Sequence, residues 1–493
     1  MRSVEYLALV QYVVPETIVA LAALAVLFLD RLALSDQSPG LRASIGAMFS
    51  AVACFFAAFW MQQNPLQGGI EPGMFITAPA VVLAKQLLLL LAIPTVLAAC
   101  DAKIRSHAGE FFALLLLSIT GMMFLVGTEN LLMMFVCLEL ATLPLYLLAC
   151  FNKTDRRAPE AALKYFLFGS MAAAFTLFGM SLIFGYAGSL ELHAIGAKLA
   201  KTQPEPLLLV AITMTLAGFG FKIAVAPFHL WAPDVYETAP LPSAALVAAG
   251  SKLASFVILA RFSSLAFSGH QGLASWNGWI PGAAPMLAIL AGASMLIGNL
   301  TALRQTSVRR LLAYSAISHS GYMAVAIAGN PGEALPSIIY YAFTYGLSTI
   351  GAFLVVGCIQ ESRGSDAPES FAGLAGEDRW LGLALLCFLL SLAGIPPLAG
   401  FFGKFYLFGA ALHTTPPLGL LWLVILGIAM SAVSLYYYLK ILKQAYVAAP
   451  VAGAKSIAVP IVLRVTILIL ALAILVFGLF PNLILGRLTS VVH

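Results

Sequence analysis

The most constraining feature of this sequence is a long series of apolar runs, most of them about long enough to cross a lipid bilayer. A spanning helix needs roughly 20 mostly apolar residues. Hydrophobic residues make up 61% of the 493 residues and charged residues only 10%, against roughly 25% charged in ordinary soluble domains. A water-soluble fold cannot hide that much apolar surface. The chain is therefore predicted to be an all-α polytopic membrane protein.

Counting the runs predicts fourteen transmembrane helices. They are expected at residues 13–34, 43–61, 78–100, 110–127, 129–150, 160–187, 207–228, 240–265, 279–300, 309–328, 334–358, 380–411, 417–440 and 463–485. The first run carries Glu16 and is followed by no cleavage-site pattern, so we interpret it as a retained helix rather than a signal peptide.

Basic residues in the connecting loops are distributed unequally between the two sides. With fourteen spans, fifteen of the 26 lysines and arginines fall on one side, five on the other and six within or at the ends of spans. Basic residues concentrate in cytoplasmic loops. Both termini are therefore expected on the outer, periplasmic side, and an even number of spans is favoured.

Motifs for redox cofactors and metals are missing from the sequence. The six cysteines are scattered without a CxxC pair, and neither GxGxxG after a strand nor GxxxxGK[ST] occurs. Zinc and iron–sulfur sites are therefore not indicated. No cofactor is expected in this chain, and any redox chemistry is expected in partner chains.

Ionisable residues deep inside the predicted spans point to function. Each costs about 2.5–3.5 kcal/mol at the bilayer centre on insertion scales. Glu139 lies midway along the fifth span, too deep for a short acidic side chain to reach water. Lys222 precedes Pro227, which removes a helix hydrogen bond, and a broken helix at membrane depth is tolerated where the backbone lines a hydrated cavity. Both residues are predicted on a proton or ion path.

Two further lysines lie at similar depth. Lys252 is in the eighth span, and Lys404 follows Pro396 and Pro397, which must break the twelfth span. We predict that Lys252 and Lys404 also belong to the path.

Three weaker candidates each have a structural alternative. Lys164 is predicted on the path, but Glu160 precedes it by four residues, so the two could form a solvated surface pair. His319 lies about 13 Å beyond Arg310 along its helix, and His229 follows the first break. Histidine titrates near neutral pH, which suits a proton relay, but either could be a satisfied core histidine.

Four other charged residues are less informative. Asp234 and Glu237 lie in a predicted loop and could line a hydrated entrance or simply be solvated. Lys85 and Arg464 lie near span ends and are expected to reach the membrane surface with their long side chains.

Together these residues suggest a proton relay without a redox cofactor. A carboxylate near a dry lysine favours its protonated form. Moving the Glu139 charge toward or away from Lys222 would therefore load or unload its proton. GFGFK, from Gly218 to Lys222, is also similar to GFFGK, from Gly400 to Lys404, five spans later. Segments five spans apart run in opposite directions through the membrane, and inverted repeats with interrupted helices are a recurring transporter design.

The chain also contains the segment KIAVAPFHLWAPDVYETAPLPSAA. This segment and the ionisable residues described above resemble the antiporter-like membrane subunits of respiratory complex I, which are related to multisubunit cation/proton antiporters. The resemblance is clearest from Phe111 to Tyr446 and favours the subunit N branch. The sequence Val-Tyr-Glu that follows Pro-Asp in this segment resembles subunit N. The subunit M pattern would have glutamate in place of Lys404. The sequence ends soon after the fourteenth span, without the long lateral helix expected of subunit L.

The resemblance implies two inverted five-helix repeats with broken seventh and twelfth helices. It divides the chain into residues 1–109 (helices 1–3), 110–265 (first repeat), 279–447 (second repeat) and 448–493 (helix 14). Glu139, Lys222, Lys252 and Lys404 match the family's ionisable positions, and Lys164 and His319 match less closely. Subunits resembling K, M, J and L are the implied partners, in a bacterial inner membrane. The resemblance also implies that NADH, FMN, iron–sulfur clusters and quinone are held by partner subunits.

Competing functions differ in what they require. A sodium/proton antiporter would need clustered oxygen ligands, and Glu139 is the one acid expected to be clearly buried. A passive scaffold would gain nothing from several buried charges, and no motif supports an active site within this chain. We therefore expect proton translocation coupled to quinone reduction elsewhere in the complex, with the cation/proton antiporter as the alternative.

Overall fold

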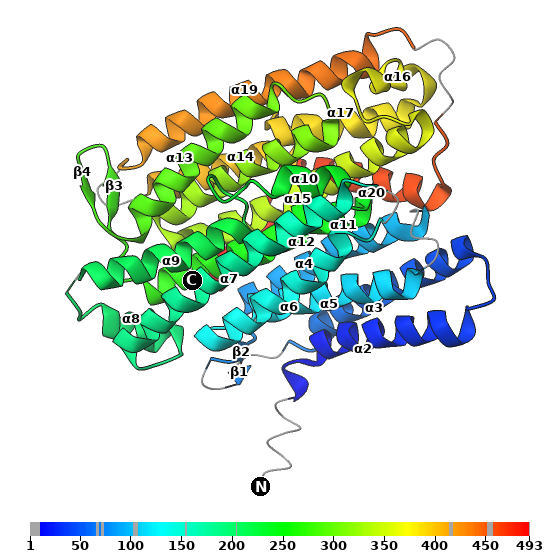
Figure 1. Ribbon diagram of the computed structural model, residues 1–493. Coiled ribbons are helices and arrows are strands. Elements are labelled where there is room, and N and C mark those ends of the chain that lie inside the picture. The colour runs from blue at the N-terminus through cyan, green and yellow to red at the C-terminus, as the bar shows by residue number, and fades with distance from the viewer. Residues whose placement is uncertain are drawn as a thin grey trace.

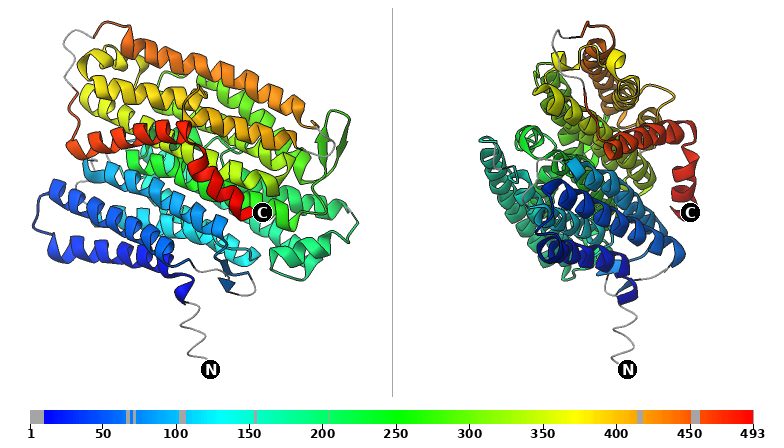
Figure 2. Two further views of the ribbon diagram at one scale, coloured as in Figure 1. Left: turned by 180° about the vertical axis from the view of Figure 1, so that it is seen from behind. Right: turned by 90° about the vertical axis from the view of Figure 1, so that its right-hand side faces the viewer.

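The structure is a computed structural model that describes residues 10–65, 69–70, 73–101, 107–152, 155–203, 205–413, 418–450 and 457–492. Helices run side by side, with their connections gathered at two opposite edges (Figures 1 and 2). Eleven described helical segments are long and apolar enough to cross a membrane, and three shorter apolar helices accompany them. The expected all-α membrane architecture is thereby confirmed.

The helices of the first half alternate with short connections. They are α2 (Val14–Phe28), α3 (Pro39–Gln63), α4 (Pro79–Leu97), α5 (Ala108–Val126), α6 (Leu131–Ala149), α7 (Ala158–Ala187), α8 (Leu192–Leu199), α9 (Pro206–Lys222), α10 (Ala232–Thr238), α11 (Leu241–Ala248) and α12 (Gly250–Ala266). A π-helical turn, Leu29–Ala33, extends α2, and a 3-10 turn, Ala98–Asp101, extends α4.

The second half continues in the same way. Its helices are α13 (Ala283–Ala302), α14 (Val308–Gly329), α15 (Pro331–Arg363), α16 (Leu374–Glu377), α17 (Arg379–Ala393), α18 (Ala399–Leu412), α19 (Leu421–Tyr446), α20 (Ile461–Leu479) and α21 (Asn482–Val492), with a 3-10 turn at Pro368–Phe371. Two antiparallel hairpins join β1 (Gly69–Ile70) to β2 (Phe75–Ile76) and β3 (Leu273–Ser275) to β4 (Gly278–Ile280).

Connections of the two predicted sides lie at different edges of the molecule. Helix α8 and the β3–β4 hairpin, both predicted outside, are at one edge, whereas α16, predicted inside, is at the other (Figure 1). We call these the outer and inner edges. The arrangement follows the loop alternation expected from the sequence.

The centre of the molecule is formed by helices that hardly touch its surface. The apolar windows of α11–α12, α14 and α15 are 94% buried, whereas those of α7 and α19 are only 33% buried. Close packing depends on small residues, as expected where lipid supplies no hydrophobic drive between helices. At Gly121 of α5, a Cβ would lie 2.4 Å from the backbone nitrogen of Ala141 in α6.

Several predicted spans differ in detail from the structure. The span predicted at 207–228 ends as a helix at Lys222, because Ala224 has a left-handed φ of 55° and Ala226 precedes a proline. The last span ends at Leu479, two residues before Pro481. The helix predicted at 240–265 is interrupted at Ala249. Helix α8 and both hairpins were not predicted.

Candidate functional site

Glu139 and Lys222 face each other between α6 and α9. The Lys222 Nζ lies 3.3 Å from Glu139 Oε1 and donates a hydrogen bond to Thr142 Oγ1 at 2.7 Å. Lys222 is buried, whereas the Glu139 side chain is 23% exposed. The sequence prediction that Glu139 is clearly buried was therefore too strong: α6 places it beside an exposed stripe.

The first helix break begins directly after Lys222. Residues 223–231 are non-helical and include Pro227. A helix end leaves carbonyl oxygens without intrahelical partners. Ser320 of α14 donates to the carbonyl of Ile223 at 2.6 Å, and the amide of Ala226 is satisfied by Ser294 Oγ at 2.8 Å. The break is thus held by side chains from the second half of the molecule.

Lys252 of α12 reaches the same serine. Its Nζ donates to Ser320 Oγ at 2.7 Å and to the carbonyl of Ala316. Lys252 is 2% exposed. Ser320 therefore connects this buried lysine to the backbone at the residue after Lys222.

His319, the neighbour of Ser320 in α14, lies among tyrosines. Its Nδ1 is 2.6 Å from the Tyr341 hydroxyl, and its Nε2 is 3.5 Å from the Tyr438 hydroxyl. The ring centroid of Tyr345, which is also 5.7 Å from Lys252 Nζ, lies 4.9 Å from the histidine ring. His319 is thus positioned between the lysine of the first half and the aromatic groups of the second.

Lys404 of α18 is bound to the second helix break. Its Nζ donates to the carbonyls of Leu392 and Ala393, at 3.0 and 2.9 Å, and to Ser431 Oγ at 2.7 Å. These two carbonyls end α17, and residues 394–398, which include Pro396 and Pro397, separate α17 from α18. The Tyr322 ring lies 5.0 Å from Lys404 Nζ and 5.4 Å from the His319 ring.

The structure therefore arranges five predicted residues in one series through the protein interior, which we call the central series. They are Glu139, Lys222, Lys252, His319 and Lys404. Sequence reasoning missed the groups that connect them. Those are Thr142, Ser320, Ser431 and the tyrosines at positions 322, 341, 345 and 438. Hydroxyls are common in apolar helices, so their residue type alone gave no signal.

Lys164 is not part of the central series. Its side chain is 43% exposed and pairs with Glu160 at 2.7 Å and Asp234 at 3.0 Å. Asp234, in the short helix α10, also binds Arg310 at 2.8 Å. Burial raises the pKa of Asp234, but the hydrogen bonds from Lys164 and Arg310 outweigh it, so its pKa lies below the ordinary value. Lys164 thus belongs to a charged network at the inner edge.

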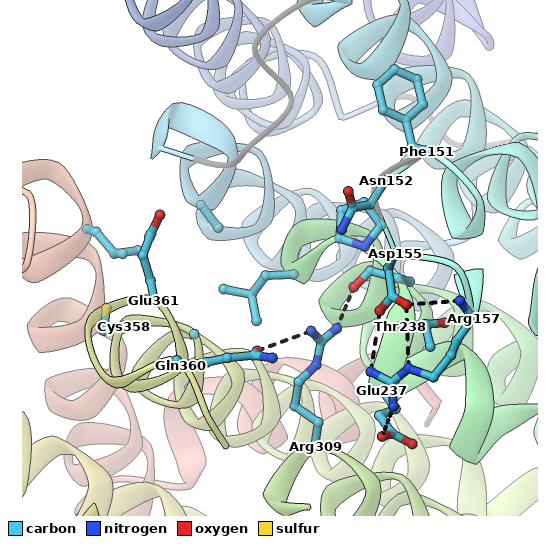
Figure 3. A pocket seen from close by; sticks show the side chains of 17 residues that line it. Phe151, Asn152, Asp155, Arg157, Glu237, Thr238, Arg309, Cys358, Gln360 and Glu361 are labelled. Carbon is cyan, nitrogen blue, oxygen red and sulfur yellow. Dashed lines mark hydrogen bonds and ion pairs between the residues drawn. The ribbon is translucent and has the colours of Figure 1, made fainter. Parts of the chain in front are cut away.

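A cavity of about 330 Å³ adjoins this network at the inner edge. Its charged and polar lining includes Asp155, Arg157, Glu237, Arg309 and Gln360 (Figure 3). Arg157 binds Glu237 at 2.8 Å, and Glu237 also binds Arg310 at 3.0 Å. The cavity can hold several water molecules, each of which occupies about 30 Å³ in the liquid.

His229 lies inside the first break and is buried, and its Nδ1 has no hydrogen-bond partner among the described residues. Its ring is 6.5 Å from that of Tyr314. No hydrogen bond in the described structure joins His229 to the central series, so its place on the path stays a prediction.

Lys85 contradicts the expectation that it reaches the membrane surface. Its side chain is 4% exposed and its Nζ lies 2.6 Å from Oε1 of the fully buried Glu16. The buried carboxylate holds the ammonium inside the protein. Arg464 does extend outward, to Asp378 at 2.8 Å, with 37% exposure.

No cluster of three or more metal-ligating side chains occurs in the described part of the chain.

Residues 128–434 match the model of the family described as NADH:quinone oxidoreductase/Mrp antiporter, transmembrane. NADH-quinone oxidoreductase subunit N 2 of Acidobacterium capsulatum is 44% identical, covering 98% of this chain and 99% of that one. Subunit N of Moorella thermoacetica is 37% identical over 86% and 87%.

Solved structures agree with this assignment. A chain of respiratory complex I from Thermus thermophilus is 33% identical, with a TM-score of 0.78 over 96% of this chain and 98% of that one. A chain of the Mrp complex from Dietzia has the same fold, with a TM-score of 0.80 over 98% and 97%, at 20% identity. The chain therefore belongs to the NADH:quinone oxidoreductase/Mrp antiporter family, as a subunit N of NADH-quinone oxidoreductase.

Proposed function

We propose that this chain moves protons across the membrane through the central series, driven by quinone reduction elsewhere in NADH:quinone oxidoreductase. The observation that carries the proposal is the buried arrangement of Glu139, Lys222, Lys252, His319 and Lys404 across both halves of the molecule. Buried ionisable groups in a membrane are costly. A proton path needs such groups close together, and here hydroxyl, backbone and aromatic-ring contacts connect them.

The Glu139–Lys222 contact supplies a way to drive the transfer. At 3.3 Å, the carboxylate favours the protonated lysine, so withdrawal of the negative charge would release that proton toward Lys252. The partial exposure of Glu139 leaves one side of its carboxylate open to a neighbouring group. A charge change in a neighbouring subunit could therefore act on Lys222 through Glu139.

Proton supply from the inner side is assigned to the charged network and cavity there. Asp234, Glu237 and Lys164 lie at that edge, and Arg310 joins the two acids at the start of α14. The same helix carries His319 and Ser320 deeper in. We assign Lys164 to this access region, and His229, in the adjoining break, to the link with the interior.

The two proposed repeats, residues 110–265 and 279–447, use their breaks in related ways. Lys222 is the last helical residue before the first break, and Lys404 donates to the carbonyls that precede the second. Each break therefore has its lysine at its edge. This similarity supports the inverted repeat suggested by the sequence, with residues 1–109 and 448–493 as additions to it.

The setting that we propose is the inner membrane of a bacterium, with both termini outside. Subunits resembling K, M, J and L are the proposed partners, and NADH, FMN, iron–sulfur clusters and quinone would be held by partner chains. Sodium transport is the weaker alternative. The carboxylate of Glu139 is occupied by a lysine, whose ammonium would repel a sodium ion, and sodium needs several oxygen ligands.

Substituting the two central lysines of the first half tests the proposal. Lys222→Ala and Lys252→Ala are expected to leave the complex assembled while lowering coupled NADH:quinone turnover at least about tenfold, equivalent to about 1.4 kcal/mol in the limiting step. Proton uptake into sealed vesicles and NADH oxidation are measured together. Lys443→Ala, at an exposed lysine, is the matched control. Normal pumping in both central variants would refute the proposal.

A further inference from the structure

Ser320 of α14 lies between a buried lysine and the first helix break. Its side chain is fully buried. Its Oγ accepts a hydrogen bond from Lys252 Nζ at 2.7 Å and donates to the carbonyl of Ile223 at 2.6 Å. The carbonyl of Ala316, one turn back in the same helix, lies farther away, at 3.0 Å. A serine hydroxyl has a single hydrogen, which therefore points to the closer carbonyl, that of Ile223.

The carbonyl of Ile223 depends on this bond. In a continuous helix it would accept a hydrogen bond from the backbone N–H four residues later. That residue is Pro227, which has no N–H. The Ser320 hydroxyl supplies the missing donor. The bond therefore fixes the backbone directly after Lys222, the last helical residue before the break.

The charge of Lys252 decides what the Ser320 hydroxyl can do. A protonated lysine has three N–H donors and no acceptor. It donates to Ser320 Oγ and to the carbonyl of Ala316, which leaves the serine hydrogen for Ile223. A neutral amine gains a lone pair, and its nitrogen is a more basic acceptor than an amide oxygen. Ser320 Oγ lies 2.7 Å from that nitrogen, and its one hydrogen cannot serve both acceptors.

The second break has the same arrangement. Lys404 Nζ donates to Ser431 Oγ at 2.7 Å, and Ser431 donates to the carbonyl of Ala393 at 3.2 Å, where α17 ends. At each break, a serine hydroxyl thus joins a buried lysine to a carbonyl of the broken backbone. An arrangement present at both breaks is better explained by a common role than by chance packing.

We propose that Ser320 is a positioning residue that transmits the charge of Lys252 to the first helix break. While Lys252 is protonated, the Ser320 hydroxyl bonds the Ile223 carbonyl and holds the break in place. After Lys252 has passed its proton to the next acceptor of the central series, the hydroxyl turns to the amine nitrogen and the carbonyl is released. Ser320 itself neither gains nor loses a proton. The surroundings of Lys222 therefore change only after Lys252 has lost its proton.

This inference rests on the proposed function, because it requires Lys252 to change charge during turnover. Backbone hydrogen exchange in residues 223–231 of the intact complex in vesicles measures local opening of the break. In the wild type, we expect these amides to exchange faster during NADH:quinone turnover than at rest. Ser320→Ala should exchange fast in both states, because the Ile223 carbonyl is never bonded. It should also pump about threefold fewer protons per NADH oxidised.

Ser294→Ala is the matched control. Ser294 holds the same break through the amide of Ala226 and otherwise donates to the carbonyl of Leu290 in its own helix. Its removal should raise exchange at rest but keep the increase during turnover, because the hydrogen bonds of Ser294 among the described residues involve no lysine.

A Ser320→Ala variant whose exchange still rises during turnover as in the wild type would overturn the inference. If this variant fails to assemble, Ser320→Cys decides, because a thiol is a weak donor. A smaller turnover increase in Ser320→Cys supports the role of Ser320, and an increase equal to that of the wild type rejects it. Normal pumping in both Lys222→Ala and Lys252→Ala would instead mean that the proposed function has failed, which distinguishes the two failures.

Discussion

The hydrogen bonds of Lys404 show what must change around this buried lysine when it releases a proton. A protonated lysine has three N–H donors, and three acceptors surround Lys404: two carbonyls and Ser431 Oγ. The neutral amine has only two donors but gains a lone pair, so deprotonation requires the Ser431 hydroxyl, which donates to the Ala393 carbonyl at 3.2 Å, to turn and donate to the amine instead. Proton release from this residue is therefore tied to a change in the hydrogen bonds that Ser431 of α19 makes beside the second break.

This geometry predicts an order for substitutions at position 404. Lys404→Arg should be mildest and Lys404→Ala intermediate, and Lys404→Glu should be most harmful because a carboxylate would face two carbonyl oxygens. From the sequence alone, glutamate would be expected to be milder than alanine, since it remains ionisable. Coupled proton pumping and the amount of assembled complex are measured for all three variants. Better pumping in Lys404→Glu than in Lys404→Ala would contradict the order.

At the scale of elements, the two helix breaks bring polar groups into a membrane interior. Each broken end leaves carbonyls that water cannot satisfy there. In the first break Ser320 bonds the carbonyl of Ile223, and in the second Lys404 bonds those of Leu392 and Ala393. The two side chains that bond these carbonyls, Ser320 and Lys404, are thus bonded to the central series or belong to it. Movement of either break would change the surroundings of its lysine.

Gly394 allows that coupling to be tested. It ends α17 with a left-handed φ of 86°, and a Cβ there would lie 3.0 Å from Lys404 Cδ. Gly364 ends α15 with a φ of 78° in open space. An alanine at either position costs about 1–2 kcal/mol of backbone strain.

Both variants should therefore lower the thermal stability of the complex by similar amounts, while only Gly394→Ala should also reduce proton pumping. Heat inactivation and vesicle pumping are compared side by side. A matching loss of pumping in Gly364→Ala would show that strain alone is responsible.

At the scale of the whole molecule, the position of Glu139 implies a covered face. Helix α6 exposes Leu132, Val136, Leu143 and Leu147 along one stripe, and Glu139 lies at its edge with 23% exposure. An acidic side chain facing lipid at mid-membrane is unfavourable. A neighbouring protein subunit is the expected cover for this stripe.

A cysteine introduced at Leu143 tests this expectation. Leu143 is 50% exposed in the isolated chain. Leu143→Cys should react with a lipid-soluble maleimide in the purified subunit and be protected in the assembled complex, because the partner excludes the reagent. Labelling is compared with that of the unsubstituted chain, which has six cysteines of its own. Equal labelling in both states would place the stripe against lipid.

The sequence by itself determined the membrane architecture, the approximate helix positions and the candidate residues Lys222, Lys252 and Lys404. Apolar runs, prolines and charges at unfavourable depth are local properties of the chain, so they can be read without knowing its partners. Only the tertiary structure decided which groups distant in sequence contact these residues. In the structure Lys164 lies at the inner edge and Lys85 is buried against Glu16. Ser320 bonds both Lys252 of α12 and the carbonyl of Ile223, the residue that follows α9. Those outcomes depend on how helices distant in sequence pack, and no local pattern encodes that packing.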